Sequence, residues 1–338
     1  AIRFASTYFI YAGNHIFTTL LVIGLLIFYH KEVARSRSTL VAVILFISLS
    51  GFIFYQTLFV ASATKISGIG IFGDPSVVHA KIEIPRNEHD TPSSIFTRFA
   101  HNRVIYAAEK FGQNYISSFS PEFLFIKGGS NGAHNIASFG NMYLIEAPFL
   151  FLGLIYMIVL NKNKNKKLIL WWFFISAIAP SITKDAPHTN RMFAIFPMLP
   201  LVTAGGAYWL ITDVLKMIWQ KKIAIGIITF LFIVNFAVYI DRYYIHFPRD
   251  EAENWGFGYK ELSQIISQPK LLNKKVIISN PQESPYIYLL FYQSYNPTLY
   301  RESALRYPPT SDGFVHVKSF SRYEFKSIDW GQDIRIPN

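Results

Sequence analysis

Long apolar stretches alternate with short polar connections over the first 240 residues of the chain. A helix rises about 1.5 Å per residue, so roughly 20 apolar residues cross the ~30 Å hydrocarbon core of a bilayer. Six stretches approach that length: 14–29, 39–60, 142–160, 168–182, 192–211 and 223–240. The pattern predicts a mainly α fold, in which residues 1–240 form a transmembrane region of about six membrane-spanning helices.

The segment 61–141, between the second and third stretches, holds a different pattern. Phe96, Ile105, Phe111 and Tyr115 recur at helical spacing, and most charged residues fall on the other side of the helical wheel. This predicts one amphipathic helix within 61–141. Such a helix lies either along the membrane surface or against other parts of the protein.

The segment 241–338 alternates helix-like and strand-like stretches. "GYKELSQIISQ" and "SPYIYLLFYQSY" are typical of helices, whereas "KKVIISN", "FVHVKSF" and "YEFKSIDW" are typical of strands. The alternation predicts a small α/β domain. Within it, 276–279 is expected to form a buried strand, and 286–292 a helix packed against it.

The positive charge of the chain follows its predicted topology. Hydrophobic residues make up 51% of the sequence, and the formal net charge is +11. Many of the cations lie in three short connections, at 30–38, 161–167 and 212–222, and short basic loops stay cytoplasmic. All three connections fall on one side of a six-helix topology. The charge is therefore read as a topology signal, and nucleic acid is not an expected partner.

The same topology places the loops 61–141 and 183–191 and the tail 241–338 on the outer side. Residue 1 is Ala and no signal peptide follows it. The simplest expectation is a C-terminal portion of a longer protein, and the alternative is a complete protein with a trimmed start. Cysteine is absent, so disulfides and thiolate metal sites do not arise.

Two polar segments carry candidate chemistry. The turn "KGGSNGAHN" (127–135) could form an anion-binding nest of backbone amides, with His134 near a phosphate or a sugar hydroxyl. A plain turn, with a histidine that has no role, is the alternative. Motifs for nucleotide binding, zinc hydrolysis and serine hydrolysis are absent from the sequence.

The second segment lies at the outer edge of the fifth apolar stretch, where Lys184, His188 and Arg191 fall within eight residues. A guanidinium can hold a phosphate through two hydrogen bonds. The alternatives are that Arg191 extends to the membrane interface or pairs with Asp185. The cluster predicts an anion site that receives the phosphate of a lipid whose tail lies between the helices.

Three segments carry a resemblance to a known family: "NYISSFSPEFLFIKGGSNGAHNIASFGNMYLIEAPFLFLGL" (114–154), "APHTNRMFAIFPMLPLVTAGG" (186–206) and "SPYIYLLFYQSYNP" (284–297). They resemble bacterial GT-C membrane glycosyltransferases, which include the protein O-mannosyltransferases and the aminoarabinose transferase of lipid A. The resemblance implies an integral protein of the bacterial plasma membrane. It also implies inverting transfer of a sugar from a polyprenyl-phosphate donor to a glycan, lipid or protein acceptor on the outer face.

The resemblance also implies roles for single residues. Arg191, with His188, resembles the family's outer-loop cation that faces the lipid phosphate. The family's catalytic acid lies in an outer loop after its first span, and nothing here matches that position. The general base is therefore expected upstream of residue 1, and the chain alone is expected to be inactive. No Asp-x-Asp motif is present in the sequence, which agrees with a route that needs no metal or other cofactor.

Two other classes of protein remain open. A transporter or flippase for a lipid-linked sugar would use the same basic edge and the same apolar groove. Against it, the sequence shows no inverted repeat and no matching pair of spans broken by glycine or proline. A non-enzymatic membrane scaffold, whose tail binds a partner, is the other alternative.

The predicted topology can be tested by introducing cysteines, because the natural chain has none. Cysteines at Ser130 and Ser311 should both react with a membrane-impermeant thiol reagent in intact cells, whereas one at Asn163 should not. Labelling of only one of the two outer positions would rule out the six-helix topology.

Overall fold

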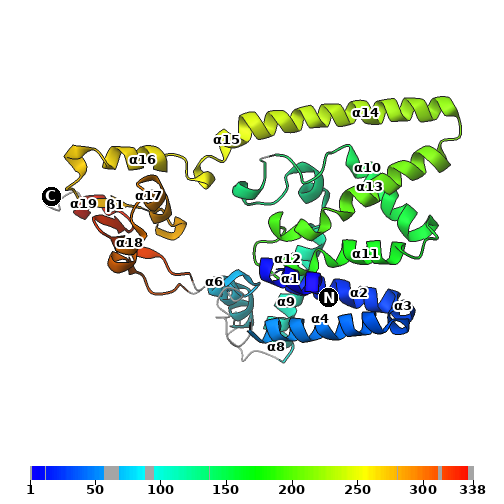
Figure 1. Cartoon of the computed structure of the whole chain (residues 1–338), viewed down its shortest axis with the longest axis horizontal. Helices are drawn as coiled ribbons and strands as arrows, with labels where there is room; N and C mark the ends of the chain where they lie inside the picture. The colour runs from blue at the N-terminus through cyan, green and yellow to red at the C-terminus, as the bar shows by residue number, and fades with distance from the viewer. Residues whose placement is uncertain are drawn as a thin grey trace. The chain divides into compact units, whose positions relative to one another are not determined.

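The computed structural model describes residues 2–11, 13–56, 68–87, 95–136, 138–279, 281–310 and 314–333. It is mainly helical, with a small sheet near the C-terminus (Figure 1). The chain divides into two compact units, Ala1–Arg249 and Asp250–Asn338. The second unit begins at Asp250 rather than at 241, because the helical path of the first unit continues through Asp241 as far as Asp250.

Helices form almost all of the regular structure up to residue 250. The α-helices are α1 (Ile2–Ile10), α2 (Gly13–Phe28), α3 (His30–Arg35), α4 (Arg37–Tyr55), α6 (Pro75–Val78), α7 (Ile84–Asn87), α8 (Ile95–Ala100), α9 (Arg103–Ser117), α10 (Glu146–Ile155), α11 (Lys166–Ile175), α12 (Ile178–Ser181), α13 (Met198–Trp209), α14 (Ile218–Asp241) and α15 (Phe247–Asp250). The π-helical segments are η2 (His79–Glu83), η3 (Glu122–Ile126), η5 (Tyr156–Leu160), η7 (Leu210–Val214) and η8 (Arg242–His246), and the 3₁₀ segments are η4 (Gly132–His134) and η6 (Asn190–Ile195).

Each of the six predicted apolar stretches contains helix in the structure. One helical run, Ile218–Asp250, is long and apolar enough by itself to cross a membrane. The stretch 192–211 lies in two helical runs, Thr189–Ile195 and Met198–Val214, which meet at an angle of 54°. The helices of the first three stretches are apolar but shorter than a full span. The helices are thus confirmed, and the number of membrane crossings stays a prediction.

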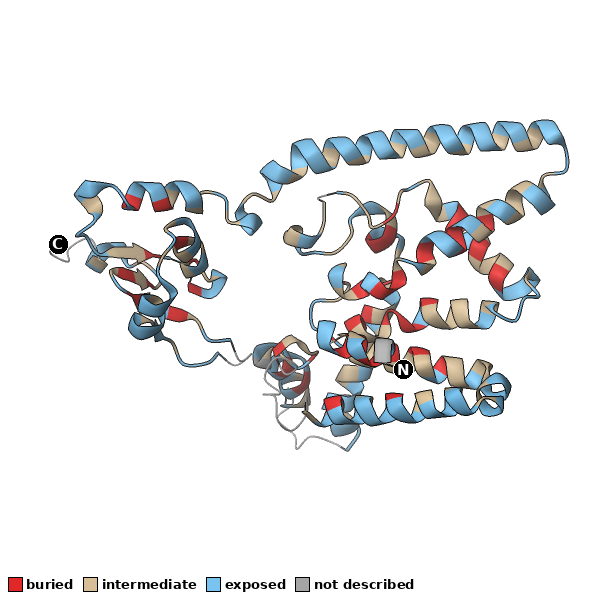
Figure 2. Ribbon diagram, in the orientation of Figure 1, coloured by how far each residue is buried: buried red, intermediate tan, exposed pale blue. Residues whose placement is uncertain are grey.

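Helix α14 has a largely apolar sequence, and its residues are exposed or half-buried along its whole length (Figure 2). None of its residues is buried, and large side chains such as Ile227 and Phe230 are more than half exposed. Helix α4 likewise exposes Ile44, Ile47 and Phe52. A helix that is apolar all round is typical of lipid contact, because water disfavours a continuous apolar surface of this extent.

The main core of the first unit surrounds the contact between α10 and α13. Phe123, Phe173, Met192, Ile195 and Leu199 are among its fully buried side chains. The two helices cross closely at Gly153 and Gly206. A Cβ atom at Gly153 would collide with the carbonyl of Val202, and one at Gly206 with the carbonyl of Phe149. Small residues allow this approach, as they do between membrane helices.

The amphipathic helix predicted within 61–141 is two helices in the structure, so the prediction of one continuous helix was wrong. Helix α8 ends at Ala100 and α9 begins at Arg103. The break is at Asn102, whose side-chain oxygen accepts hydrogen bonds from the amides of Val104 (2.9 Å) and Ile105 (3.0 Å). An asparagine in this N-cap position starts a new helix and stops the preceding one.

A buried amide joins α9 to the segment that follows α12. The Asn114 side chain is 1% exposed, and its Nδ2 donates to the carbonyls of Ser181 (3.0 Å) and Thr183 (2.8 Å). The residues after Ser181 also pair in antiparallel fashion with residues 69–71, through a bridge between Gly70 and Thr183. Three segments that lie far apart in the sequence therefore meet at Asn114.

The second unit is a small α/β domain, as the sequence predicts. Its helices are α16 (Tyr259–Ile266), α17 (Tyr286–Tyr292), α18 (Pro297–Ser303) and α19 (Trp330–Asp333), with 3₁₀ turns η9 (Glu253–Trp255), η10 (Pro269–Leu271) and η11 (Pro281–Glu283). Its strands are β1 (Val276–Ile278), β2 (Leu305–Arg306), β3 (Val317–Phe320) and β4 (Tyr323–Phe325), in the order β1-β4-β3-β2. Strand β1 is parallel to β4, and the other pairs are antiparallel.

The core of this domain confirms the packing expected for 276–279 and 286–292. Ile278 on β1 and Leu289 on α17 are buried in one cluster with Phe320 and Phe325. Helix α18 and strand β2 were not predicted. The short strand β2, only two residues long, carries too little pattern to be seen in the sequence.

The Asn114 contact makes a specific prediction about stability. Asn114→Ala leaves two buried carbonyls without a donor, which should lower the free energy of unfolding by about 2–4 kcal/mol. Asn114→Asp, which keeps the size but not the N–H donor, should cost at least as much. Gln113→Ala is the control, because the Gln113 side chain is exposed and its amide donates a hydrogen bond to the exposed Glu109. Thermal unfolding in detergent measures all three, and an Asn114→Asp protein as stable as the wild type would contradict the assignment.

Candidate functional site

Arg191 is held at the start of η6 by an acidic partner. Its guanidinium forms an ion pair with Asp185, and the Arg191 side chain is 17% exposed while that of Asp185 is 43% exposed. Tyr11 lies close to Arg191. Burial raises the pKa of the Tyr11 hydroxyl, and the positive charge of Arg191 opposes that rise. The pairing with Asp185, which the sequence left open as an alternative, is the arrangement that the structure shows.

His188 lies in the same loop and is almost fully enclosed. His188 is 7% exposed. Its Nδ1 atom has no hydrogen-bond partner within the described part of the chain. Burial lowers the pKa of His188, and the neighbouring charge of Arg191 lowers it further. His188 is therefore neutral at pH 7 and keeps one ring nitrogen for a ligand.

The turn 127–135 lies against this loop. The ring of His134 is 5.1 Å from that of His188, measured between centroids. A hydrogen bond between the Thr189 hydroxyl and the Asn135 side chain joins the two segments. The same Asn135 oxygen accepts the amide of Gly129 at 2.8 Å, so this amide already has a partner within the turn. The structure thus brings His134 to the site, but one donor of the expected nest is occupied.

Lys184 has a different environment from Arg191. Its backbone amide donates to the carbonyl of Ile69 at 3.0 Å, and its side chain lines a cavity of about 430 Å³ beside Asp74. None of the other three predicted site residues lines that cavity. The structure therefore groups Arg191, His188 and His134 and places Lys184 elsewhere.

Together, the grouped residues can bind an anion in exchange for Asp185. A carboxylate and a phosphate compete for the same face of a guanidinium, and the partly exposed Asp185 is free to turn towards solvent. His188 can add one neutral hydrogen bond. The described residues contain no group of three or more His, Cys, Asp or Glu side chains that could hold a metal ion.

The sequence does not predict the cavity beside Lys184. Its other cations, Lys81 and Lys110, lie far from Lys184 in the chain, and no local spacing connects them. The pairing of 69–71 with 182–184 is what brings them together. Such a pairing involves only three residues on each side, and it leaves no periodic signal in the sequence.

No family model, curated protein or solved structure matches the chain. The function proposed below is inferred from the arrangement of the residues and from the sequence resemblance.

The buried state of His188 predicts a loss of stability in acid. Because the pKa of His188 is lower in the folded protein than in the unfolded chain, the unfolded chain binds the proton more readily. The contribution of neutral His188 to the free energy of unfolding is complete above about pH 6.5 and is lost as the pH falls. The free energy of unfolding then changes by at most about 1.4 kcal/mol per pH unit. His188→Gln should flatten this slope in thermal unfolding between pH 5 and 7.5.

The same exchange at the exposed His30 controls for the simple loss of an imidazole. If His188→Gln and wild type lose stability in parallel as the pH falls, His188 is not the buried neutral group described above.

Proposed function

We propose that this chain belongs to a membrane glycosyltransferase that transfers a sugar from a polyprenyl-phosphate donor to an acceptor on the outer face of the bacterial plasma membrane. The observation that carries the proposal is the grouping of Arg191 with the buried, neutral His188 beside apolar helices. The negative charge of a lipid phosphate complements the guanidinium of Arg191. The apolar hydrocarbon chain of the lipid can pack against the apolar helices. The sequence resemblance specifies the sugar-transfer chemistry.

The membrane part of the proposal is a six-helix topology. Each predicted stretch is helical, and both α4 and α14 present apolar surfaces that suit lipid. Tryptophans lie at or beside the basic connections assigned to the inner side: Trp171 and Trp172 follow 161–167, Trp209 precedes 212–222 and Trp219 lies within it. Tryptophan is enriched at membrane interfaces, which supports the same assignment.

In the proposed reaction, the acceptor hydroxyl oxygen forms a bond to the anomeric carbon of the sugar. The bond from that carbon to the phosphate oxygen breaks, and the polyprenyl phosphate leaves with the electron pair. Arg191 stabilises the charge that builds on this phosphate, and His188 donates or accepts one hydrogen bond. A carboxylate that acts as general base takes the acceptor proton, as the resemblance implies.

A flippase for a lipid-linked sugar is the second candidate, and one observation favours it. The helical runs Thr189–Ile195 and Met198–Val214 bend by 54° directly after the candidate site. Broken helices of this kind surround substrates in many transporters. The two candidates differ in outcome, because a flippase moves the donor across the bilayer without breaking the sugar–phosphate bond.

Substitution of Arg191 tests the transferase. In membranes that contain the active protein, Arg191→Ala should reduce transfer from a polyprenyl-phosphate sugar by roughly 30- to 1000-fold, or about 2–4 kcal/mol of transition-state stabilisation. Arg191→Lys should recover only part of the rate, because an ammonium group does not reproduce a two-pronged contact. Rates are normalised to the amount of enzyme in the membrane.

Asp185→Asn is the matched variant, because it removes the same ion pair from the other side. It should keep most of the activity and should lower the KM for the donor, since Asp185 no longer competes with the phosphate. An equal loss of activity in Asp185→Asn and Arg191→Ala, or wild-type turnover in Arg191→Lys, would reduce Arg191 to a structural partner of Asp185.

A further inference from the structure

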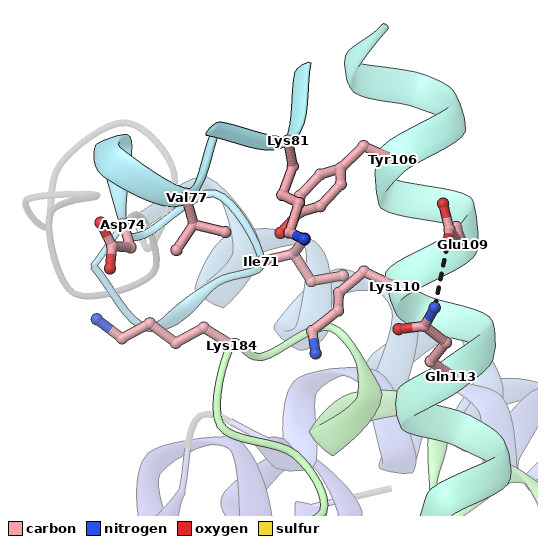
Figure 3. Close-up of a pocket in the computed structure, with 9 residues that line it drawn as sticks. All are labelled: Ile71, Asp74, Val77, Lys81, Tyr106, Glu109, Lys110, Gln113 and Lys184. Carbon is pink, nitrogen blue, oxygen red and sulfur yellow. Dashed lines mark hydrogen bonds between the residues drawn. The ribbon is translucent and has the colours of Figure 1, made fainter. Parts of the chain in front are cut away.

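The cavity beside Lys184 is built from three separate segments (Figure 3). Asp74, Val77 and Lys81 come from 71–84, Lys110 comes from α9, and Lys184 comes from the loop after α12. In Figure 3 the Lys184 side chain extends towards Asp74, while Lys81 and Lys110 come from two other elements near Tyr106. The cavity encloses about 430 Å³, which is enough for a small headgroup or a monosaccharide.

The walls of this cavity are fixed by hydrogen bonds. Asn114, one turn after Lys110 on α9, holds the carbonyls of Ser181 and Thr183. The amide of Lys184 bonds to Ile69, which fixes the backbone under the third lysine. On the opposite wall, Asp74 accepts the amide of Ser76 at 3.0 Å. The backbone positions from which the lysine side chains extend are therefore set by the fold.

The carboxylates in the cavity are engaged with their own neighbours. Asp74 also accepts the Ser76 hydroxyl at 2.6 Å, and these bonds from Ser76, more than the charge of Lys184, lower the pKa of Asp74. Glu109 accepts a hydrogen bond of 3.0 Å from Gln113.

Within the described residues, Lys81, Lys110 and Lys184 form no ion pair with any carboxylate. The three lysines outnumber the two carboxylates that line the cavity, Asp74 and Glu109, so the cavity keeps a net positive charge that a bound anion offsets.

We propose that this cavity binds a phosphate ester that carries adjacent hydroxyl groups. The three lysines supply the charge for the phosphate. Asp74 and Glu109 can accept hydrogen bonds from the hydroxyls, and the ring of Tyr106 offers a flat face for the carbon skeleton. The headgroup of phosphatidylglycerol and a soluble glycerol or sugar phosphate share this chemistry. The site is separate from Arg191, and it does not depend on the function proposed above.

The test is binding to the purified chain in a neutral detergent, with two probes. Glycerol 1-phosphate represents the soluble source, and short-chain dihexanoyl phosphatidylglycerol represents the lipid headgroup. Lys81→Gln/Lys110→Gln should weaken binding by roughly 10- to 100-fold, as expected for the loss of charge-assisted contacts. Lys162→Gln/Lys167→Gln changes the net charge equally at lysines outside the cavity, and it should bind as the wild type does.

Binding of only the lipid probe assigns the site to a membrane headgroup, and binding of only the soluble probe assigns it to a solute; either result supports the site. Tyr106→Leu gives a second readout, because it should weaken the binding of glycerol 1-phosphate but leave the binding of inorganic phosphate unchanged. The proposal is overturned if neither probe binds the wild type at millimolar concentration, or if the cavity variant and the control variant bind equally well.

Discussion

The Asn114 amide is the contact on which both candidate sites depend. It is buried, it comes from α9, and its side-chain N–H groups donate to the carbonyls of Ser181 and Thr183. Leaving these carbonyls unpaired is costly, so the end of α12 is held against α9. The loop 183–191 starts at this point, and at its far end the bond from Thr189 to Asn135 holds it again. A short loop that is fixed at both ends positions its charged side chains reproducibly.

That loop distributes its cations between two environments. Lys184 lines a cavity with two further lysines, where no carboxylate of the described residues forms an ion pair with it, whereas Arg191 pairs with Asp185 beside the buried His188. The first arrangement favours binding of an anion without displacement of a partner. The second favours an exchange of one anion for another, which suits a group that must bind a phosphate and then release it.

The elements that could be predicted are those specified by local pattern. Apolar stretches predicted the helices, and the alternation after residue 241 predicted strand β1 and helix α17. The break at Asn102 was missed because the apolar period continues across it, and a single capping side chain outweighs that period. Because Lys184 and Arg191 lie close together in the sequence, both were predicted to belong to one anion site. Their separation comes from the pairing of 182–184 with 69–71, a tertiary contact that no local pattern encodes.

We propose that a lipid phosphate binds between the loop 183–191 and the turn 127–135. The most direct test is photo-crosslinking of the chain with a polyprenyl phosphate that carries a diazirine on the first isoprene unit, followed by mapping of the adducts by mass spectrometry. Adducts are expected within 184–196 and 128–136, and they should be lost when unlabelled polyprenyl phosphate competes but persist when polyprenol is added. Adducts confined to the lipid-facing surface of α14, or equal competition by polyprenol, would contradict the proposal.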